Sequence, residues 1–296
     1  MVNDIENLIR LPKKEEDKFA EFIRNYRRKL ISSPKDTAEK ATEHNSDFIL
    51  GLINNGNITK AIVELRELAY DEFLKEESIF NSYVLKEIGK NFDAPKARLD
   101  ELCLFLSETD TLNPLMLKDN IIDLFGSYSG YISPYIYQLC LSNTQSRRSR
   151  AGKTFEGIIY FLYEHFNYPY ASQASIGKKT FSDLGLGKVV DSILPSIDAF
   201  NQRRDKTIVG TMKTTLRERW QEVVEEVARS NLPNIHLLTV DESIAASKAE
   251  QMAKHNIVLV VRNDVKNRDE MKDRRSIIDF ETYFLNELPE TLKFWS

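Results

Sequence analysis

The sequence predicts an α/β protein in which a mixed central β-sheet is flanked by helices and preceded by a helical subdomain. Two observations support this prediction. Short runs rich in β-branched residues, bounded by Gly, Pro, Asn or Asp, occur in the second half of the chain and alternate with helical segments. The first half shows apolar residues at helical spacing instead. We therefore expect a helical N-terminal domain at residues 1–110 and an α/β domain at residues 111–296.

The expected N-terminal helices are amphipathic. Within Thr59–Glu76, for example, Ile62, Leu65, Leu68 and Ala69 recur at helical spacing. We expect further helices over Asp4–Leu30, after Ser33, over Ser78–Lys90 and over Pro95–Ser107.

The expected sheet comes from four segments in the second half: Val189–Leu194, Thr207–Met212, Ile235–Val240 and Asn256–Val261. Helices are expected between the later strands, over Leu216–Arg229 and Ser243–Lys254. Others are expected before the first strand, over Pro114–Phe125, Pro134–Leu141 and Ser146–His165, and one over Phe280–Leu288 ends the domain.

Charge is distributed unevenly along the chain. The net charge is −4, but residues 146–220 hold 13 Lys or Arg against 7 Asp or Glu, a local +6 that leaves −10 for the rest. Such a basic block indicates a surface for an anionic ligand, although a solvated basic face is the plainer interpretation.

Other features of composition exclude several classes of protein. The two cysteines, Cys103 and Cys140, are too few for a disulfide framework, and we expect both to be small core residues. Four scattered histidines do not form a zinc motif. We find neither a long apolar run nor a signal-peptide pattern at the N-terminus, so we expect a cytoplasmic protein.

Asp191 and Lys213 are the candidate catalytic pair. One expected strand carries Asp191 and the next ends at Lys213, so neighbouring strands bring a carboxylate and a lysine together. A carboxylate suits Mg²⁺, which prefers oxygen ligands and activates water for attack on a phosphodiester. A lysine offsets negative charge that develops on the phosphate. Taken alone, this pair is weak support for an active site, because many α/β domains contain one by chance.

A second acid is needed to complete a metal site. The residue two positions before Lys213 is Thr211, which cannot replace a charged ligand. The expected helix after Lys213 offers Glu222, Glu225 and Glu226, and the expected helix before the sheet offers Glu156.

Two basic segments suit contact with DNA. Arg217, Glu218 and Arg219 lie at the start of the expected helix after Lys213; arginine binds guanine in the major groove and glutamate accepts from cytosine. Arg147, Arg148, Arg150 and Lys153 place four cations in seven residues and suit DNA phosphates. For each segment the plainer interpretation is a solvated helix surface.

Three segments together resemble one family. SRAGKTFE at Ser149–Glu156, VDSILPS at Val190–Ser196 and KTTLRERW at Lys213–Trp220 are similar to Type II restriction endonucleases that recognise CCGG, CCNGG or CCWGG. The likeness is to SsoII, PspGI and the catalytic domain of EcoRII, and it extends from about residue 143 to 295. It implies the restriction-endonuclease-like fold of the PD-(D/E)XK nucleases. Val190 departs from the pattern, because the family more often has proline before the aspartate.

The resemblance also implies roles for single residues. Asp191, Glu226 and Glu156 would hold Mg²⁺, with Lys213 beside them, although Glu222 and Glu225 remain alternatives to Glu226. Arg217, Glu218 and Arg219 would read the C·C/G·G half-site, and Gln145 occupies the position of a glutamine that reaches bases.

The resemblance further implies a homodimer that cuts double-stranded DNA 5′ of the CC dinucleotide, with a cognate DNA methyltransferase as its genetic partner. Members with a five-base core flip the central nucleotide out of the duplex, and Phe92 occupies the position of a residue that stacks on it. Phe92 also suits an ordinary core position. Three alternatives remain: a repair-type nuclease with the same core, a non-catalytic sequence-specific DNA-binding protein and a helical interaction module.

Overall fold

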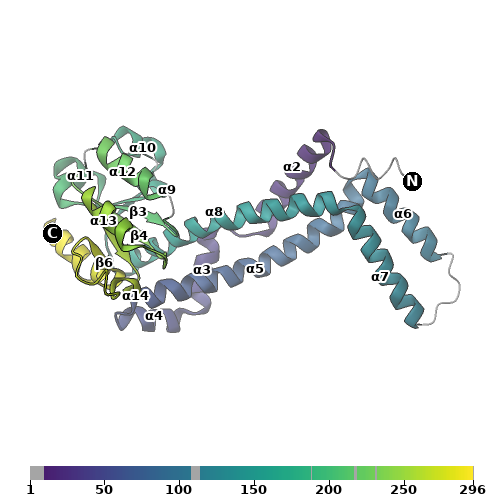
Figure 1. Cartoon of the computed structure of the whole chain (residues 1–296), viewed down its shortest axis with the longest axis horizontal. Helices are drawn as coiled ribbons and strands as arrows, with labels where there is room; N and C mark the ends of the chain where they lie inside the picture. The colour runs from purple at the N-terminus through teal and green to yellow at the C-terminus, as the bar shows by residue number, and fades with distance from the viewer. Residues whose placement is uncertain (1–9, 108–113, 188, 217–218, 231, 296) are drawn as a thin grey trace. The chain divides into compact units, whose positions relative to one another are not determined.

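The structure is a computed structural model that describes residues 10–107, 114–187, 189–216, 219–230 and 232–295. The chain folds into two compact units, here called the helical unit (residues 1–33 and 71–149) and the sheet unit (residues 34–70 and 150–296). This division differs from the expected boundary near residue 110. Two long helices, α5 (Ile58–Asn91) and α8 (Ser133–His165), each contribute residues to both units (Figure 1), so the helical unit is discontinuous in sequence.

The helical unit contains α2 (Lys13–Leu30), α6 (Asp93–Ser107), α7 (Pro114–Tyr131) and parts of α5 and α8. In α2, Phe19 and Ile23 lie one helical turn apart and are both buried. They pack against Phe80 and Ile88 of α5 and against Tyr135 of α8. The unit is thus held together by an apolar core to which α2, α5, α7 and α8 contribute.

The sheet unit contains six strands in the order β1-β2-β3-β4-β5-β6. They are β1 (Ala171–Ser172), β2 (Ser192–Leu194), β3 (Ile208–Lys213), β4 (Ile235–Thr239), β5 (Ile257–Val261) and β6 (Ile277–Asp279). β1, β2 and β3 pair antiparallel, whereas β3 to β6 pair parallel. Ser192 pairs with Gly210, where an added Cβ would come within 2.6 Å of the Ser192 hydroxyl and displace it.

Both faces of the sheet are covered by helices, because successive side chains in a strand point to opposite faces. On one face, Met212, Leu238 and Val260 pack against α4 (Ser46–Asn54) and parts of α5 and α8. On the other, Val209, Leu237 and Leu259 pack against α12 (Arg219–Ser230) and α13 (Ala246–Lys254). The result is a helix–sheet–helix sandwich (Figure 1).

Shorter elements complete the sheet unit: α3 (Pro34–His44), α9 (Gln173–Ile176), α10 (Lys178–Asp183), α11 (Ile197–Gln202), η1 (Arg204–Lys206) and α14 (Asn263–Lys266). The expected last helix is interrupted, with a π-helical segment η2 (Tyr283–Glu287) between α15 (Phe280–Thr282) and α16 (Leu288–Lys293). The four expected strands and the two helices between the later ones are confirmed. The short strands β1 and β6 were not expected from the sequence.

One composition-based expectation is wrong. Cys103 and Cys140 are both exposed rather than buried. Neighbouring residues in a helix point in different directions, so an apolar stretch of sequence does not place each of its members in the core. None of the helices in the described part of the chain combines the length and apolar character needed to cross a membrane.

Candidate active site

Asp191 lies directly before β2, next to the end of β3, and is 8% exposed. Its Oδ2 accepts a hydrogen bond from the backbone N–H of Met212 at 2.6 Å and lies 3.6 Å from Nζ of Lys213. These contacts bring together the two residues that the sequence predicted as a pair. They arise because β2 runs antiparallel to β3, so the start of β2 meets the end of β3.

Three hydrogen bonds fix the backbone of Asp191. Its N–H donates to the carbonyl of Gly210 at 2.9 Å, and its own carbonyl accepts from the N–H of Gln173 at 3.0 Å. The Tyr160 hydroxyl donates to the same carbonyl at 3.1 Å. Gln173 also donates through Nε2 to the Val190 carbonyl at 3.3 Å. Gln173 and Tyr160 therefore support the site, and no sequence motif singled them out.

Thr211 occupies the position at which the simple form of the nuclease motif has an acid. Its hydroxyl donates to the Val189 carbonyl at 2.6 Å and lies 3.4 Å from Oδ2 of Asp191. Thr211 thus ties the segment before Asp191 to β3. As the sequence indicated, it supplies no charge to the site.

Glu156 of α8 adds a second carboxylate beside Asp191. Burial and the nearby Asp191 charge raise the pKa of Glu156 to about 7, against a smaller lowering by Lys213 and Lys153. Burial also raises the pKa of Asp191, although Lys213 and the Met212 N–H oppose this. Two desolvated carboxylates that repel each other are the donor set that a hard divalent cation relieves. The residues present therefore fit Mg²⁺.

Glu226 is held apart from this cluster. It is 5% exposed, its carboxylate accepts from the backbone N–H of Gly187, and it pairs with Arg229 at 2.8 Å. A Cβ at position 187 would lie 2.1 Å from the Glu226 carboxylate, so a larger residue there would displace that side chain. Among the residues that the structure describes, no group of three His, Cys, Asp or Glu side chains could hold a metal ion.

Burial does separate the three glutamates of α12. Glu222 and Glu225 are exposed, whereas Glu226 is buried and bonded to the segment that leads into Asp191. Of the alternatives that the sequence left open, Glu226 is therefore the one that lies beside the active-site segment.

The predicted base-reading residues can be placed only in part. Arg217 and Glu218 lie outside the described residues. The backbone of Arg219 begins α12, while its side chain is not described. Gln145 is exposed on α8. The structure thus describes the start of α12 and not the side chains that the sequence predicted to read bases.

The four predicted phosphate-contacting residues all lie on α8 and differ in their surroundings. Arg148 and Lys153 are exposed. Arg147 forms a bidentate ion pair with Glu77, which is 2% exposed, and Arg150 donates to the Thr37 hydroxyl at 2.8 Å. Arg147 therefore has a structural partner within the helical unit, so a phosphate is not required to explain it.

Phe92 is 1% exposed in the core of the helical unit. Its ring makes edge contacts with Phe19, Phe22 and Tyr135, and Nζ of Lys18 lies 4.8 Å from the ring centroid. These neighbours leave no open ring face on which a flipped base could stack, so we do not propose that role for Phe92.

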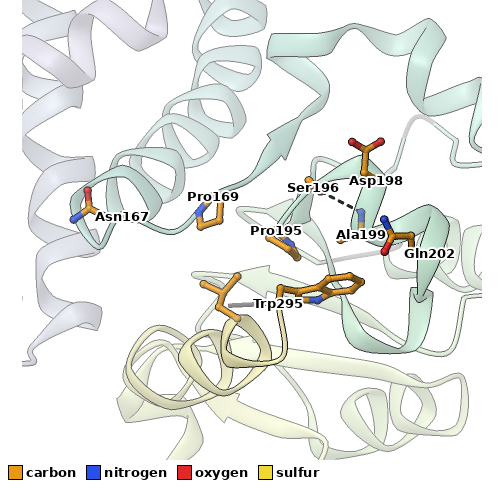
Figure 2. A pocket seen from close by; sticks show the side chains of 9 residues that line it. Asn167, Pro169, Pro195, Ser196, Asp198, Ala199, Gln202 and Trp295 are labelled. Carbon is orange, nitrogen blue, oxygen red and sulfur yellow. Dashed lines mark hydrogen bonds between the residues drawn. The ribbon is translucent and has the colours of Figure 1, made fainter.

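A pocket of about 530 Å³ lies at the opposite end of β2 from Asp191 (Figure 2). Pro195, Asp198 and Trp295 are among its lining residues, and the Ser196 hydroxyl accepts from the N–H of Ala199 at 3.1 Å. Its described lining contains a carboxylate and no basic side chain, so it does not suit a DNA phosphate.

Comparisons with known proteins show the family of the chain. The family described as EcoRII C terminal matches residues 126–284, more than half of the chain. The chain is 31% identical to the Type II restriction enzyme SsoII of Shigella sonnei over 254 residues, which cover 86% of the chain and 74% of SsoII. It is 24% identical to the Type II restriction enzyme EcoRII of Escherichia coli over 153 residues, 50% of the chain and 35% of EcoRII.

Solved structures show the same fold. Metal-depleted Ecl18kI in complex with uncleaved DNA superposes with a TM-score of 0.72 at 27% identity and covers 95% of this chain and 86% of its own. The PspGI–substrate DNA complex gives a TM-score of 0.59 at 20% identity, with 89% and 94% covered, and supports the fold alone. The predicted restriction-endonuclease-like fold is confirmed.

Proposed function

Because this chain belongs to the EcoRII C-terminal family and is a Type II restriction endonuclease, we propose that it cuts a palindromic site with a CC/GG core in a Mg²⁺-dependent reaction. The core is of the CCNGG, CCWGG or CCGG type, with or without further flanking bases, and the cut falls 5′ of CC. The single observation that supports the chemistry best is the contact of Lys213 with a carboxylate that is itself next to Glu156.

Mg²⁺ bound at this site would supply charge neutralisation at the phosphate and a more acidic water. Asp191 and Glu156 are the residues proposed to hold it. Glu226, which lies apart from them, is proposed to support the segment that leads into Asp191 through its bond to the Gly187 N–H. The described hydrogen bonds of the Asp191 carboxylate use Oδ2, so Oδ1 is the oxygen that we assign to the cation. Lys213 would donate to the attacking water or to the phosphate, where its charge offsets the negative charge of the transition state.

DNA contacts are proposed for three groups of residues. Arg217, Glu218 and Arg219 would read the G·C pairs of the core from the major groove, with Gln145 as a further base contact. Arg148 and Lys153 are the strongest candidates for phosphate contacts. Both are exposed, and both belong to the basic segment of α8 that the sequence predicted to contact phosphates.

We also propose that two copies act together. A palindrome presents the same half-site twice, and a chain with a single active site needs a second copy to cut both strands. A DNA methyltransferase that modifies the same site would protect the host, and both proteins would act in the cytoplasm. Where the core has five bases, the central nucleotide would be flipped out, which 2-aminopurine fluorescence at that position would detect.

Cleavage of defined duplexes tests the proposal. Duplexes with CCGG, CCAGG and CCCGG in common flanks, and a control in which the first CC is changed to CT, are incubated with Mg²⁺ or with EDTA. We expect cutting of at least one intact core in Mg²⁺ alone, with 5′ ends at the first C, and no cutting of the control. Cleavage of the control at the same rate, or equal cleavage in EDTA, would contradict the proposal.

A further inference from the structure

Asp241, at the end of β4, makes a set of backbone contacts that the site described above does not include. Its Oδ2 accepts from the N–H of Leu216 at 2.8 Å, and its Oδ1 accepts from the N–H of Ser243 at 2.8 Å. Its own N–H donates to the Thr239 hydroxyl at 3.1 Å. Both carboxylate oxygens are thus engaged. The contact with Thr239 holds the backbone of Asp241, and the contact with Ser243 holds its carboxylate beside the Leu216 N–H.

Leu216 is the residue immediately before Arg217. Its side chain is 1% exposed in the same core as Val223 and Val227 of α12. Its backbone N–H is the group that Asp241 accepts. Core packing therefore fixes the side chain of Leu216, and the Asp241 carboxylate fixes its backbone N–H. The chain thus reaches Arg217 from a defined position.

The same carboxylate is tied to the strand that carries Lys213. In the parallel pairing of β3 with β4, Lys213 lies opposite Thr239. Thr239 comes two residues before Asp241 in the sequence. Asp241 therefore joins the end of β4 to the segment that follows Lys213 in β3. A charge-assisted hydrogen bond to a backbone N–H is about twice as strong as a neutral one. The Asp241 carboxylate is therefore suited to keep Leu216 in place when DNA binds.

We propose that Asp241 is a positioning residue for base recognition: it sets the position from which Arg217, Glu218 and Arg219 reach the bases, relative to Lys213. This inference rests on the proposed function, in which those three residues read the CC/GG core. Asp241 itself would touch neither DNA nor the reacting phosphate. Its loss would therefore affect discrimination between sites more than the rate of the chemical step.

The test compares Asp241→Ala and Asp241→Asn with a matched control, Asp264→Ala. Asp264 follows the neighbouring strand β5, and its carboxylate pairs with the Arg262 side chain. For each variant we would measure binding in Ca²⁺ and single-turnover cleavage in Mg²⁺. The substrates are a core duplex and a duplex with one core G·C pair replaced.

For Asp241→Ala we expect the ratio of the affinity for the core duplex to that for the substituted duplex to fall about 10-fold. The saturating cleavage rate of the core duplex should change less than about threefold. Asp241→Asn keeps one of the two acceptor oxygens and should lose less, so it carries the test if the alanine variant does not fold. Asp264→Ala should keep the ratio. An unchanged ratio in both Asp241 variants would overturn the inference, as would an equal loss of affinity for both duplexes.

A fourth variant separates this inference from the proposed function. If Arg217→Ala reduces discrimination and the Asp241 variants do not, the readout by Arg217 stands and the positioning role of Asp241 fails. If Arg217→Ala also leaves discrimination unchanged, the proposed readout itself fails.

Discussion

Nζ of Lys213 lies 3.6 Å from Oδ2 of Asp191, although the two residues are 22 positions apart in sequence. The same Oδ2 accepts the Met212 N–H, so the strand that delivers the lysine also orients the carboxylate. Removing the lysine should therefore affect both transition-state charge and the ionisation of Asp191.

Replacement of Lys213 with Ala should reduce single-turnover cleavage in Mg²⁺ by at least about 100-fold, the usual cost of losing a group that stabilises transition-state charge. Binding of the core duplex in Ca²⁺ should change by no more than a few-fold, because Lys213 would not read bases. Lys254→Ala, an exposed lysine on α13, serves as the control. Cleavage by Lys213→Ala at the unmodified rate would show that the site lies elsewhere.

Replacement of Glu156 with Gln should stabilise the metal-free protein above pH 7. Well below pH 4.5 both the folded and the unfolded chain hold a protonated Glu156, so its ionisation does not change the free energy of unfolding. Between 4.5 and about 7 the unfolded chain ionises while the folded chain keeps its proton, so stability falls as pH rises and stays lower above pH 7.

Thermal melts in EDTA at pH 4 and pH 8 check this prediction. At pH 8 the free energy of unfolding of Glu156→Gln should exceed that of the parent by on the order of 1–2 kcal/mol, after allowance for partial solvent exposure. At pH 4 the two should differ little. The variant should also gain less stability from added Mg²⁺ than the parent does, since one ligand is lost. Glu250→Gln, an exposed position on α13, is the control. A destabilised Glu156→Gln at pH 8 would contradict the raised pKa.

Replacement of Glu226 with Gln should reduce cleavage by at least about 10-fold, as expected for a carboxylate that binds metal or supports its ligands. Glu222→Gln and Glu225→Gln should cut within about twofold of the parent, because both side chains are exposed on the same helix. Cleavage rates of the three variants at saturating Mg²⁺ give the comparison. A larger loss in Glu222→Gln or Glu225→Gln than in Glu226→Gln would transfer the role of second acid to that residue.

Arg147 and Arg148 are neighbours on α8 that should respond in different ways. Arg148→Ala should leave the melting temperature unchanged. It should reduce the slope of the logarithm of the DNA-binding constant against the logarithm of salt concentration by about one, as for one lost phosphate contact. Arg147→Ala should destabilise the protein by on the order of 2 kcal/mol, because Glu77 would stay buried without its ionic partner. Binding isotherms at several salt concentrations and thermal melts distinguish the two outcomes.

The sequence by itself determined the α/β class, the strand that follows Asp191, the strand that ends at Lys213, and the family. Each follows from local information: β-branched runs bounded by turn residues, and short motifs in a fixed order. The pairing of Asp191 with Lys213 was also predictable, because consecutive antiparallel strands bring the start of one to the end of the other.

Only the tertiary structure decided which groups support that pair. Gln173 and Tyr160 hold Asp191 from α9 and α8, Glu226 bonds to Gly187, and Asp241 holds Leu216 from the segment after β4. It also paired Arg147 with Glu77, buried Phe92 and divided α5 and α8 between two units. These contacts join residues far apart in the chain, so their partners depend on packing, whereas periodicity and motif spacing report only on near neighbours.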